Sequence, residues 1–263
     1  MRSFWEVRSH VEASLRAGAR VVLLSDFDGT LAPLVHQPGR ARLPARARRA
    51  LERLVRRPRF LLGIVTGRSL ADIRRRVKLG RAAYVGSHGM EYVVPGERPV
   101  RLVGREYGPL LRQLRERVQR LLPKVPGLRW EAKPYSVALH YRQARSGDVP
   151  GILSVARRAA MEYHPAFRLQ RGKKVVEFLP NVGASKATAV RAILSKLQGK
   201  SRDACLRVYF GDDVTDEAVF RLLRQEGWTV RVGSLRGRTR ARYYLRSPAE
   251  VRRWLEWLAE VCK

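Results

Sequence analysis

The segment RVVLLSDFDGT, Arg20–Thr30, decides the fold class of this chain. Residues 20–25 form an apolar run without alternation, which predicts a strand buried on both faces of a parallel sheet. The run ends in DFDGT, where Gly29 favours a sharp turn. In such sheets the functional groups lie at the carboxyl ends of the strands. We therefore expect Asp26 and Asp28 to lie in a functional site.

A β/α alternation surrounds this strand. Residues 44–57 have helical spacing, and a second apolar run, Phe60–Val65, follows them and ends at TGRS. Further strands are expected over 82–87, 206–210, 228–232 and 242–245. Further helices are expected over 69–77 and 185–197, up to residue 224, and from residue 248. The alternation predicts an α/β fold with a doubly wound parallel sheet and a Rossmann-like core.

The last helix has a clear start signal. Ser247 is expected as its N-cap, with Pro248 at the first helical position and Glu250 three residues after the cap. This arrangement predicts a capping box, in which each side chain accepts a hydrogen bond from the other residue's backbone.

The pattern of apolar and polar residues changes between residues 105 and 180. Two alternating segments, 128–133 and 136–142, predict a hairpin between helical stretches over 110–122 and 149–163. Two more strands, 167–170 and 175–179, complete an αββαββ order. We therefore expect a catalytic core formed by residues 1–104 and 181–263. An α+β cap domain over 105–180 is inserted into it.

Charge is the unusual feature of the composition. The chain has 54 basic and 23 acidic residues and a net charge of +31, which raises nucleic-acid binding as a function. The basic residues are mostly arginines spread along the whole chain, and no aromatic stacking surface is evident. We therefore do not expect nucleic acid as the main partner, although secondary binding to polyanions stays open.

The chain carries no signal for membrane insertion. Its longest apolar runs, 21–24 and 60–65, are far shorter than the roughly 18 residues that span a bilayer. Cys205 and Cys262 show no metal-ligand or redox spacing, which is typical of thiols in a reducing compartment. We expect a monomeric cytoplasmic protein without a membrane partner.

Acids are scarce here, yet they gather at two strand ends. Asp26 and Asp28 end the first strand, and the segment GDDVTDE follows another. Its acids include Asp212, Asp213 and Asp216. Such carboxylates repel one another unless a divalent metal or a proton offsets their charge. The sequence therefore predicts a Mg²⁺ site or an acid with a raised pKa, although acids at a helix start would also be favourable.

Two further groups lie at the same edge of the predicted sheet. Thr66 ends the second strand and offers a hydroxyl, and Lys186 begins a helix and offers an ammonium group. Taken alone, a helix cap would explain Thr66 and a surface position would explain Lys186. Together with the acids they form a set that suits phosphoryl transfer, which depends on positioning and charge neutralisation.

In chain order, DxDGT, Thr66, Lys186 and GDDxTD resemble the four motifs of the haloacid dehalogenase-like phosphatases, and the insert resembles their C2-type cap. Within that superfamily GSHGMEY, EAKPYSVALHYR, GKKVVEFLP and YFGDDVTDEAVF are similar to the trehalose-6-phosphate phosphatase family. The resemblance spans nearly the whole chain.

The resemblance implies a role for each motif. Asp26 would be the nucleophile that forms an aspartyl-phosphate, and Asp28 the general acid and base. Thr66 and Lys186 would bind phosphoryl oxygens. The implied ligands of Mg²⁺ are Asp26, the backbone carbonyl of Asp28 and Asp212, with Asp213 or Asp216 acting through water.

The resemblance also implies a set of sugar-binding residues. These are Glu91 in the core and Glu131, Lys133, His140, Arg142, Lys173 and Glu177 in the cap. Alternative roles stay open for the cap residues: structural ion pairs for the two glutamates, a polar sheet face for His140 and Arg142, and a solvated edge for the lysines.

The function implied is a Mg²⁺-dependent phosphatase that converts trehalose 6-phosphate to trehalose and phosphate, with a functional link to a trehalose-6-phosphate synthase. Two alternatives are related capped phosphatases acting on sucrose 6-phosphate or mannosyl-3-phosphoglycerate. A basic nucleic-acid-binding protein on the same fold is a third alternative. The presence of suitable residues at all four catalytic positions argues against it.

Overall fold

The computed structural model describes residues 1–35, 37–122, 124–198, 205–235 and 237–262. The chain divides into two compact units. The core unit consists of Met1–Val100 and Ser185–Lys263, and the inserted unit of Arg101–Ala184. The core unit is an α/β domain with a largely parallel sheet and the inserted unit is α+β, so the predicted fold class is confirmed.

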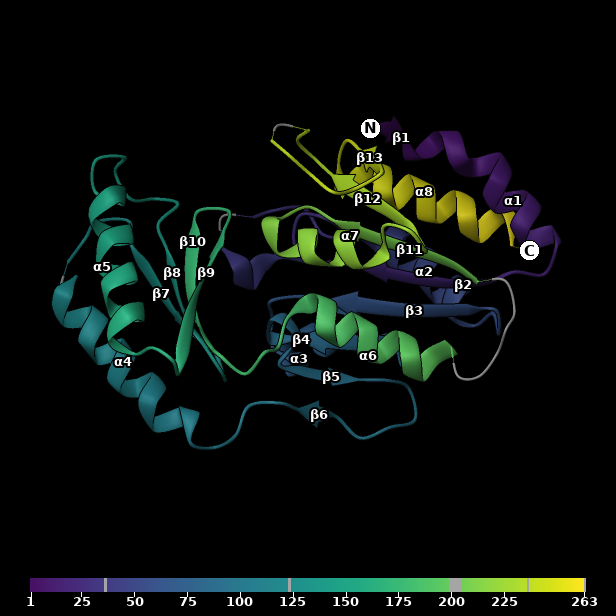
Figure 1. The fold of residues 1–263 in the computed structure, drawn as a ribbon. Helices are drawn as coiled ribbons and strands as arrows, with labels where there is room; N and C mark the ends of the chain where they lie inside the picture. The colour runs from purple at the N-terminus through teal and green to yellow at the C-terminus, as the bar shows by residue number, and fades with distance from the viewer. Residues whose placement is uncertain (36, 123, 199–204, 236, 263) are drawn as a thin grey trace. The chain divides into compact units, whose positions relative to one another are not determined.

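The described residues of the core unit form a nine-stranded sheet in the order β1-β13-β12-β11-β2-β3-β4-β5-β6 (Figure 1). Its strands are β1 (Arg2–Ser3), β2 (Arg20–Ser25), β3 (Phe60–Val65), β4 (Ala83–Gly86), β5 (Glu91–Val93), β6 (Val100–Arg101), β11 (Cys205–Gly211), β12 (Trp228–Val232) and β13 (Tyr243–Leu245). Neighbours from β1 to β4 in this order are parallel, whereas β5 is antiparallel to β4. The carboxyl ends of β11, β2 and β3 therefore meet at one edge.

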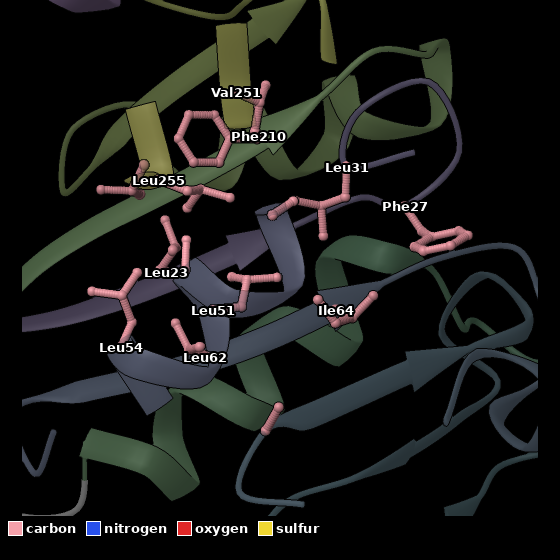
Figure 2. Close-up of a cluster of buried hydrophobic side chains, with 14 of the residues drawn as sticks. Leu23, Phe27, Leu31, Leu51, Leu54, Leu62, Ile64, Phe210, Val251 and Leu255 are labelled. Atoms are coloured by element: carbon pink, nitrogen blue, oxygen red, sulfur yellow. The ribbon is translucent and has the colours of Figure 1, made fainter. Parts of the chain in front are cut away.

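Helices cover both faces of this sheet. They are α1 (Arg8–Arg16), α2 (Ala45–Val55), α3 (Leu70–Val77), α6 (Lys186–Gln198), α7 (Glu217–Leu223) and α8 (Pro248–Val261). Leu23 of β2 belongs to a buried cluster with residues of α2, α3 and α8, part of which is drawn in Figure 2. Its neighbour Leu24 belongs to a second cluster with residues of α6 and α7. Successive side chains of β2 are thus buried on opposite faces, which explains why its sequence does not alternate.

The inserted unit has its own sheet and core. Its elements are α4 (Tyr107–Leu121), β7 (Arg129–Ala132), β8 (Val137–His140), α5 (Val149–Glu162), β9 (Phe167–Gly172) and β10 (Val175–Pro180). The strands pair antiparallel in the order β7-β8-β10-β9, which confirms the predicted hairpin. Leu139 and Val176 pack with Leu114 of α4 and Ala156 of α5. One face of this sheet is therefore covered by the two helices.

Two local predictions need correction. Ser247 caps α8 by accepting a hydrogen bond from the Glu250 N–H at 3.3 Å, but the Glu250 carboxylate accepts from the Arg246 N–H at 2.7 Å. The reciprocal half of the capping box is therefore wrong. The short strands β1, β5 and β6 were not predicted, because two or three residues carry no measurable periodicity.

No helix among the described residues is long and apolar enough to cross a membrane.

Candidate active site

A buried lysine joins two of the predicted acids. Asp26 follows β2 directly, and its N–H donates to the Phe210 carbonyl of β11 at 2.9 Å. Lys186, the first residue of α6, lies with its Nζ 2.7 Å from Asp26 Oδ1 and 2.8 Å from Asp216 Oδ1. All three residues are buried, with exposed fractions of 5% or less. Lys186 is thus a buried counter-ion, not a surface lysine.

Asp216 also organises the GDDVTDE loop. Its Oδ2 accepts hydrogen bonds from the backbone N–H groups of Asp212 and Asp213 at 3.0 Å, and the Tyr209 hydroxyl donates to its Oδ1 at 2.7 Å. Asp213 caps the following turn by accepting from the Val214 N–H at 2.8 Å. These bonds hold the loop so that Asp212 faces the strand ends.

Three carboxylates form a group that fits a metal ion. Asp26, Asp212 and Asp216 each offer a ligand oxygen, and the three atoms lie within 4.8 Å of one another. With Lys186 they carry a formal charge of −3 + 1 = −2 when ionised, which suits a hard divalent cation. Gly29 keeps this space open, because a Cβ there would lie 2.2 Å from Asp212 Oδ2 and its φ is +86°.

The closeness of the carboxylates and their burial affect the pKa values of Asp26 and Asp216. Burial raises the pKa of the Asp26 carboxyl well above its ordinary range, and the charges of Asp216 and Asp212 add to this although Lys186 opposes it. Burial also acts to raise the pKa of Asp216, but the Lys186 ammonium and the hydrogen bonds from the Asp213 N–H and the Tyr209 hydroxyl together lower that pKa. A further cation at the three carboxylates would therefore favour the ionised form of Asp26.

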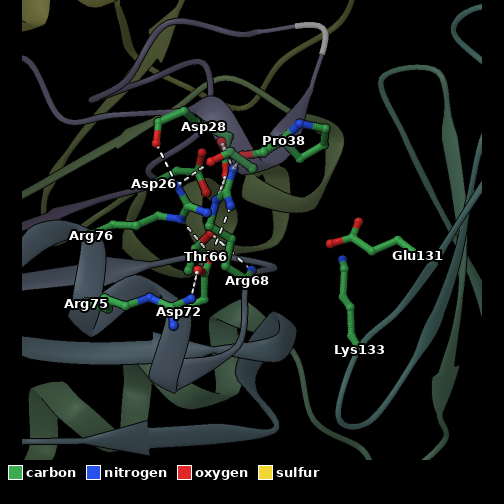
Figure 3. A network of polar contacts seen from close by, with 12 residues as sticks. Asp26, Asp28, Pro38, Thr66, Arg68, Asp72, Arg75, Arg76, Glu131 and Lys133 are labelled. Atoms are coloured by element: carbon green, nitrogen blue, oxygen red, sulfur yellow. Dashed lines mark hydrogen bonds and ion pairs between the residues drawn. The ribbon is translucent and has the colours of Figure 1, made fainter.

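Asp28 lies apart from the three-carboxylate group and is held by Arg68, a residue that the sequence prediction missed. Nε and Nη2 of Arg68 donate to the two Asp28 oxygens at 2.6 and 2.7 Å. Arg68 also donates to Asp72 Oδ2 at 3.0 Å and to the Pro38 carbonyl at 2.7 Å (Figure 3). The position of Arg68 in TGRS, three residues after a buried strand, indicates a place near the site. The large number of arginines in the chain hides this indication.

Thr66 and Lys186 lie where their motifs predicted, at a strand end and a helix start. Thr66 is buried after β3, and its hydroxyl accepts from the Arg68 N–H at 3.2 Å. The start of α6 packs tightly against the GSHGMEY segment, because a Cβ on Gly89 would lie 2.1 Å from the Ser185 carbonyl oxygen. The glycine therefore allows the close approach that positions Lys186.

Glu91 is buried beside this region. Its Oε1 accepts hydrogen bonds from the Leu70 N–H at 2.7 Å and from the Ser87 hydroxyl at 2.8 Å. The first of these satisfies a backbone donor at the start of α3. In this structure Glu91 links α3 to the end of β4.

Four of the predicted sugar-binding residues contact one another in pairs within the inserted unit. His140 Nε2 lies 2.7 Å from Glu131 Oε2, and Lys133 Nζ lies 2.9 Å from both oxygens of Glu177. Ser136 also donates to Glu177. Glu131 and Glu177 both lie opposite Ala138 in the sheet register, so they share a face.

This face is the one that α4 and α5 leave uncovered, since Leu139 and Val176 point to the helices. Arg142 and Lys173 lie at the exposed end of the same strands, where Arg142 Nη2 donates to the Lys173 carbonyl at 3.1 Å. The inserted unit therefore presents a polar sheet face rich in charged donors and acceptors.

Three arginines donate hydrogen bonds to Asp72, and its pKa should therefore give the stability of the fold a measurable dependence on pH. Burial alone would raise its pKa, but hydrogen bonds from Arg76, Arg68 and Arg75 lower it to about 2. The pKa of an aspartate in the unfolded chain is about 4. Because the pKa is lower in the folded state, the ionised carboxylate stabilises the fold above about pH 4, and this stabilisation is lost as the pH falls through about 2. Because solvent screens this half-buried carboxylate, Asp72→Asn should lower the free energy of unfolding by only about 1 kcal/mol at pH 7.

Urea unfolding at a series of pH values measures this effect. The difference between wild type and Asp72→Asn should close between about pH 4 and pH 2. Glu162→Gln, which alters an exposed ion pair with Arg117, is a control that should change stability little at any pH. A difference for Asp72→Asn that persists unchanged at pH 2 would contradict the assignment.

Comparisons with known proteins identify the family of this chain. A trehalose-phosphatase family model matches residues 24–249. Trehalose-phosphate phosphatase B from Arabidopsis thaliana is 30% identical over 254 residues, covering 92% of this chain and 67% of that protein. Trehalose 6-phosphate phosphatase RA3 from Zea mays is 31% identical over 257 residues, covering 92% of this chain and 70% of that protein.

Among solved structures, the C-terminal domain of trehalose-6-phosphate phosphatase from C. albicans has a similar fold, with a TM-score of 0.79 and 22% identity over 96% of both chains. The family match includes DFDGT and GDDVTDE, the two segments whose acids meet beside Lys186. Because this match covers most of the sequence, the chain belongs to the trehalose-phosphatase family.

Proposed function

We propose that this protein hydrolyses trehalose 6-phosphate to trehalose and phosphate through an aspartyl-phosphate on Asp26. The observation that carries the proposal is the buried arrangement of Asp26, Lys186 and Asp216 at the carboxyl ends of β2 and β11. Family membership and the names of the relatives support the substrate. The free thiols of Cys205 and Cys262 fit a cytoplasmic location, where a trehalose-6-phosphate synthase would supply the substrate.

Two carboxyl groups divide the work in this mechanism. An oxygen of Asp26 attacks phosphorus, and the bond between phosphorus and the sugar oxygen breaks while Asp28 donates a proton to that oxygen. Asp28 then takes a proton from water, which attacks phosphorus, releases phosphate and restores Asp26. The two hydrogen bonds from Arg68 would orient the ionised Asp28 carboxylate that takes the proton from water.

The remaining groups neutralise charge. Lys186 and the Thr66 hydroxyl would bind oxygens of the phosphoryl group. Asp26, Asp212 and the backbone carbonyl of Asp28 would hold Mg²⁺, with Asp216 or Asp213 acting through water. The ion would supply positive charge next to both the carboxylates and the phosphate oxygens.

We further propose that the inserted unit, together with Glu91, recognises the sugar. A disaccharide has many hydroxyl groups, and each needs a hydrogen-bond partner when it loses contact with water. The polar face formed by Glu131, Lys133, His140 and Glu177, with Arg142 and Lys173 at its end, offers such partners.

Phosphate release from a panel of sugar phosphates in the presence of Mg²⁺ tests the substrate directly. Trehalose 6-phosphate should have the highest kcat/KM, above sucrose 6-phosphate, mannosyl-3-phosphoglycerate and glucose 6-phosphate. A preference for sucrose 6-phosphate would overturn the substrate while leaving the phosphatase mechanism intact. No hydrolysis of any member would overturn both.

Chelation should silence the enzyme. Without a divalent ion the three carboxylates repel the phosphate dianion, and the pKa of Asp26 stays raised. We expect treatment with EDTA to abolish phosphate release and added Mg²⁺ to restore it. Unchanged activity after exhaustive chelation would contradict the metal site. Ca²⁺ is a useful comparison, because its looser coordination should restore activity poorly.

Glu177→Gln separates sugar recognition from the chemical step. The variant keeps the side-chain shape but removes the charge that orients Lys133. Losing a charged hydrogen bond to the sugar should lower kcat/KM on trehalose 6-phosphate about tenfold or more. Activity on p-nitrophenyl phosphate, which has no sugar, should stay unchanged.

Glu162→Gln on α5 is the matched control, because it makes the same chemical change elsewhere in the inserted unit. It should leave both activities unchanged. Equal losses on the two substrates for Glu177→Gln would instead assign Glu177 a purely structural role.

A further inference from the structure

Helix α2 carries a row of exposed arginines. Residues 42–59 contain eight arginines and one acid, Glu52. Ala47, Ala50, Leu51 and Leu54 are buried in a cluster that α2 shares with the sheet and α8, so the opposite side of the helix faces outward. Those outward positions include Arg46, Arg49, Arg53 and Arg56, which we call the arginine stripe. They are spaced three or four residues apart and therefore lie along one side of the helix.

The arginine stripe does not stabilise its own helix. None of its four side chains makes an ion pair or hydrogen bond with another described residue. Like charges three or four positions apart repel one another. On α8, by contrast, Arg252 lies 4.0 Å from Glu256 and Arg253 lies 3.4 Å from Glu250. The stripe thus leaves its positive charge uncompensated, as a binding surface for an anion requires.

The positive surface continues onto α3. The Arg48 guanidinium donates to the backbone carbonyls of Val77 and, at 2.8 Å, Arg76, which fixes the end of α3 beside α2. Exposed Arg74, Lys78 and Arg81 lie at this end of α3. None of these residues belongs to the active site, so the phosphatase mechanism leaves this charge unexplained.

The chemistry of this surface fits a phosphate polymer. Large exposed hydrophobic side chains occur at several places among the described residues, but none lies on α2 or α3, whereas helices that bind membrane surfaces insert such side chains. Guanidinium groups match phosphate oxygens in geometry and bind them bidentately. From Arg46 to Arg56 the helix rises about 15 Å. A nucleic-acid duplex presents about nine phosphate charges over that length.

We propose that the arginine stripe and the cations at the end of α3 bind the phosphodiester backbone of nucleic acid without sequence preference. This binding is separate from the hydrolytic function. Dispersal of arginines along the sequence argued against such a surface, but the burial of one side of α2 gathers the exposed ones on the other side. Backbone binding of this kind depends steeply on salt, because each contact releases counter-ions from the polymer.

Fluorescence anisotropy with the full chain and a labelled DNA duplex of about 20 base pairs tests the proposal. If the four stripe arginines each contact one phosphate, they should contribute about −3.6 to the slope of log K against log salt, and contacts by the α3 cations would make the slope steeper. The stripe variant Arg46→Gln/Arg49→Gln/Arg53→Gln should bind at least about tenfold more weakly at 100 mM salt, with a slope smaller by about 2.7. A variant with lysines at the same three positions should keep most of the slope.

The control variant Arg112→Gln/Arg115→Gln/Arg120→Gln removes the same charge from exposed positions on α4. It should bind DNA within about twofold of wild type, and all variants should hydrolyse p-nitrophenyl phosphate equally. Equal weakening in the stripe and control variants would show that net charge alone is responsible and would overturn the proposal. Binding of wild type to phosphatidylserine vesicles but not to DNA would assign the surface to membranes instead.

Discussion

Asp26→Asn is expected to lower kcat by about 10⁴-fold or more, because the amide nearly matches the carboxylate in shape but cannot attack phosphorus. The same substitution should leave the thermal stability of the metal-free protein unchanged or raise it. Burial and the charges of Asp216 and Asp212 raise the pKa of Asp26, so its ionised form destabilises the fold at neutral pH. Removing that charge relieves the repulsion.

A loss of activity without a loss of stability distinguishes this assignment from simple misfolding. Phosphate release under saturating trehalose 6-phosphate measures kcat, and thermal unfolding after chelation measures stability. Near-normal turnover by a folded Asp26→Asn protein would remove Asp26 as the nucleophile. A large loss of stability would show that the carboxylate supports the fold more than the repulsion costs it.

Lys186→Met should be the most destabilising single change in the active site. The substitution keeps the length of the side chain but leaves Asp26 and Asp216 without the ammonium that contacts both. Removing one partner from a buried ion pair costs about 3–5 kcal/mol, because the remaining charge stays buried without compensation. The variant should also lose about 10²–10³-fold in kcat, if Lys186 donates to the phosphoryl oxygens as we propose.

Lys196→Met on the same helix is the matched control. Lys196 also pairs with a carboxylate, Glu97, but both side chains are exposed, so the change should affect stability little. Urea unfolding of both variants measures the difference. Adding Mg²⁺ should recover part of the stability of Lys186→Met, because the ion would offset the same carboxylates. Equal stability of the two variants would contradict the role of Lys186 as a buried counter-ion.

The sequence by itself determined the fold class and the acids of the site. An apolar run without alternation at 20–25 required a strand covered on both faces, and Leu23 and Leu24 do belong to opposite buried clusters. Alternation at 128–142 required a sheet with one polar face, and that hairpin formed as predicted. These features follow from local periodicity, which a single chain segment carries on its own.

Only the tertiary structure decided which charged groups meet. Lys186 contacts Asp26 across 160 positions of the chain, and Arg68 contacts Asp28 across 40. Such pairs depend on the order of the strands in the sheet and on the position of the helix start relative to it. Neither can be inferred from the periodicity of the sequence. Burial in the folded chain is also a tertiary property. It places the Arg68 guanidinium inside the protein and leaves the arginines of α2 exposed on one side of the helix.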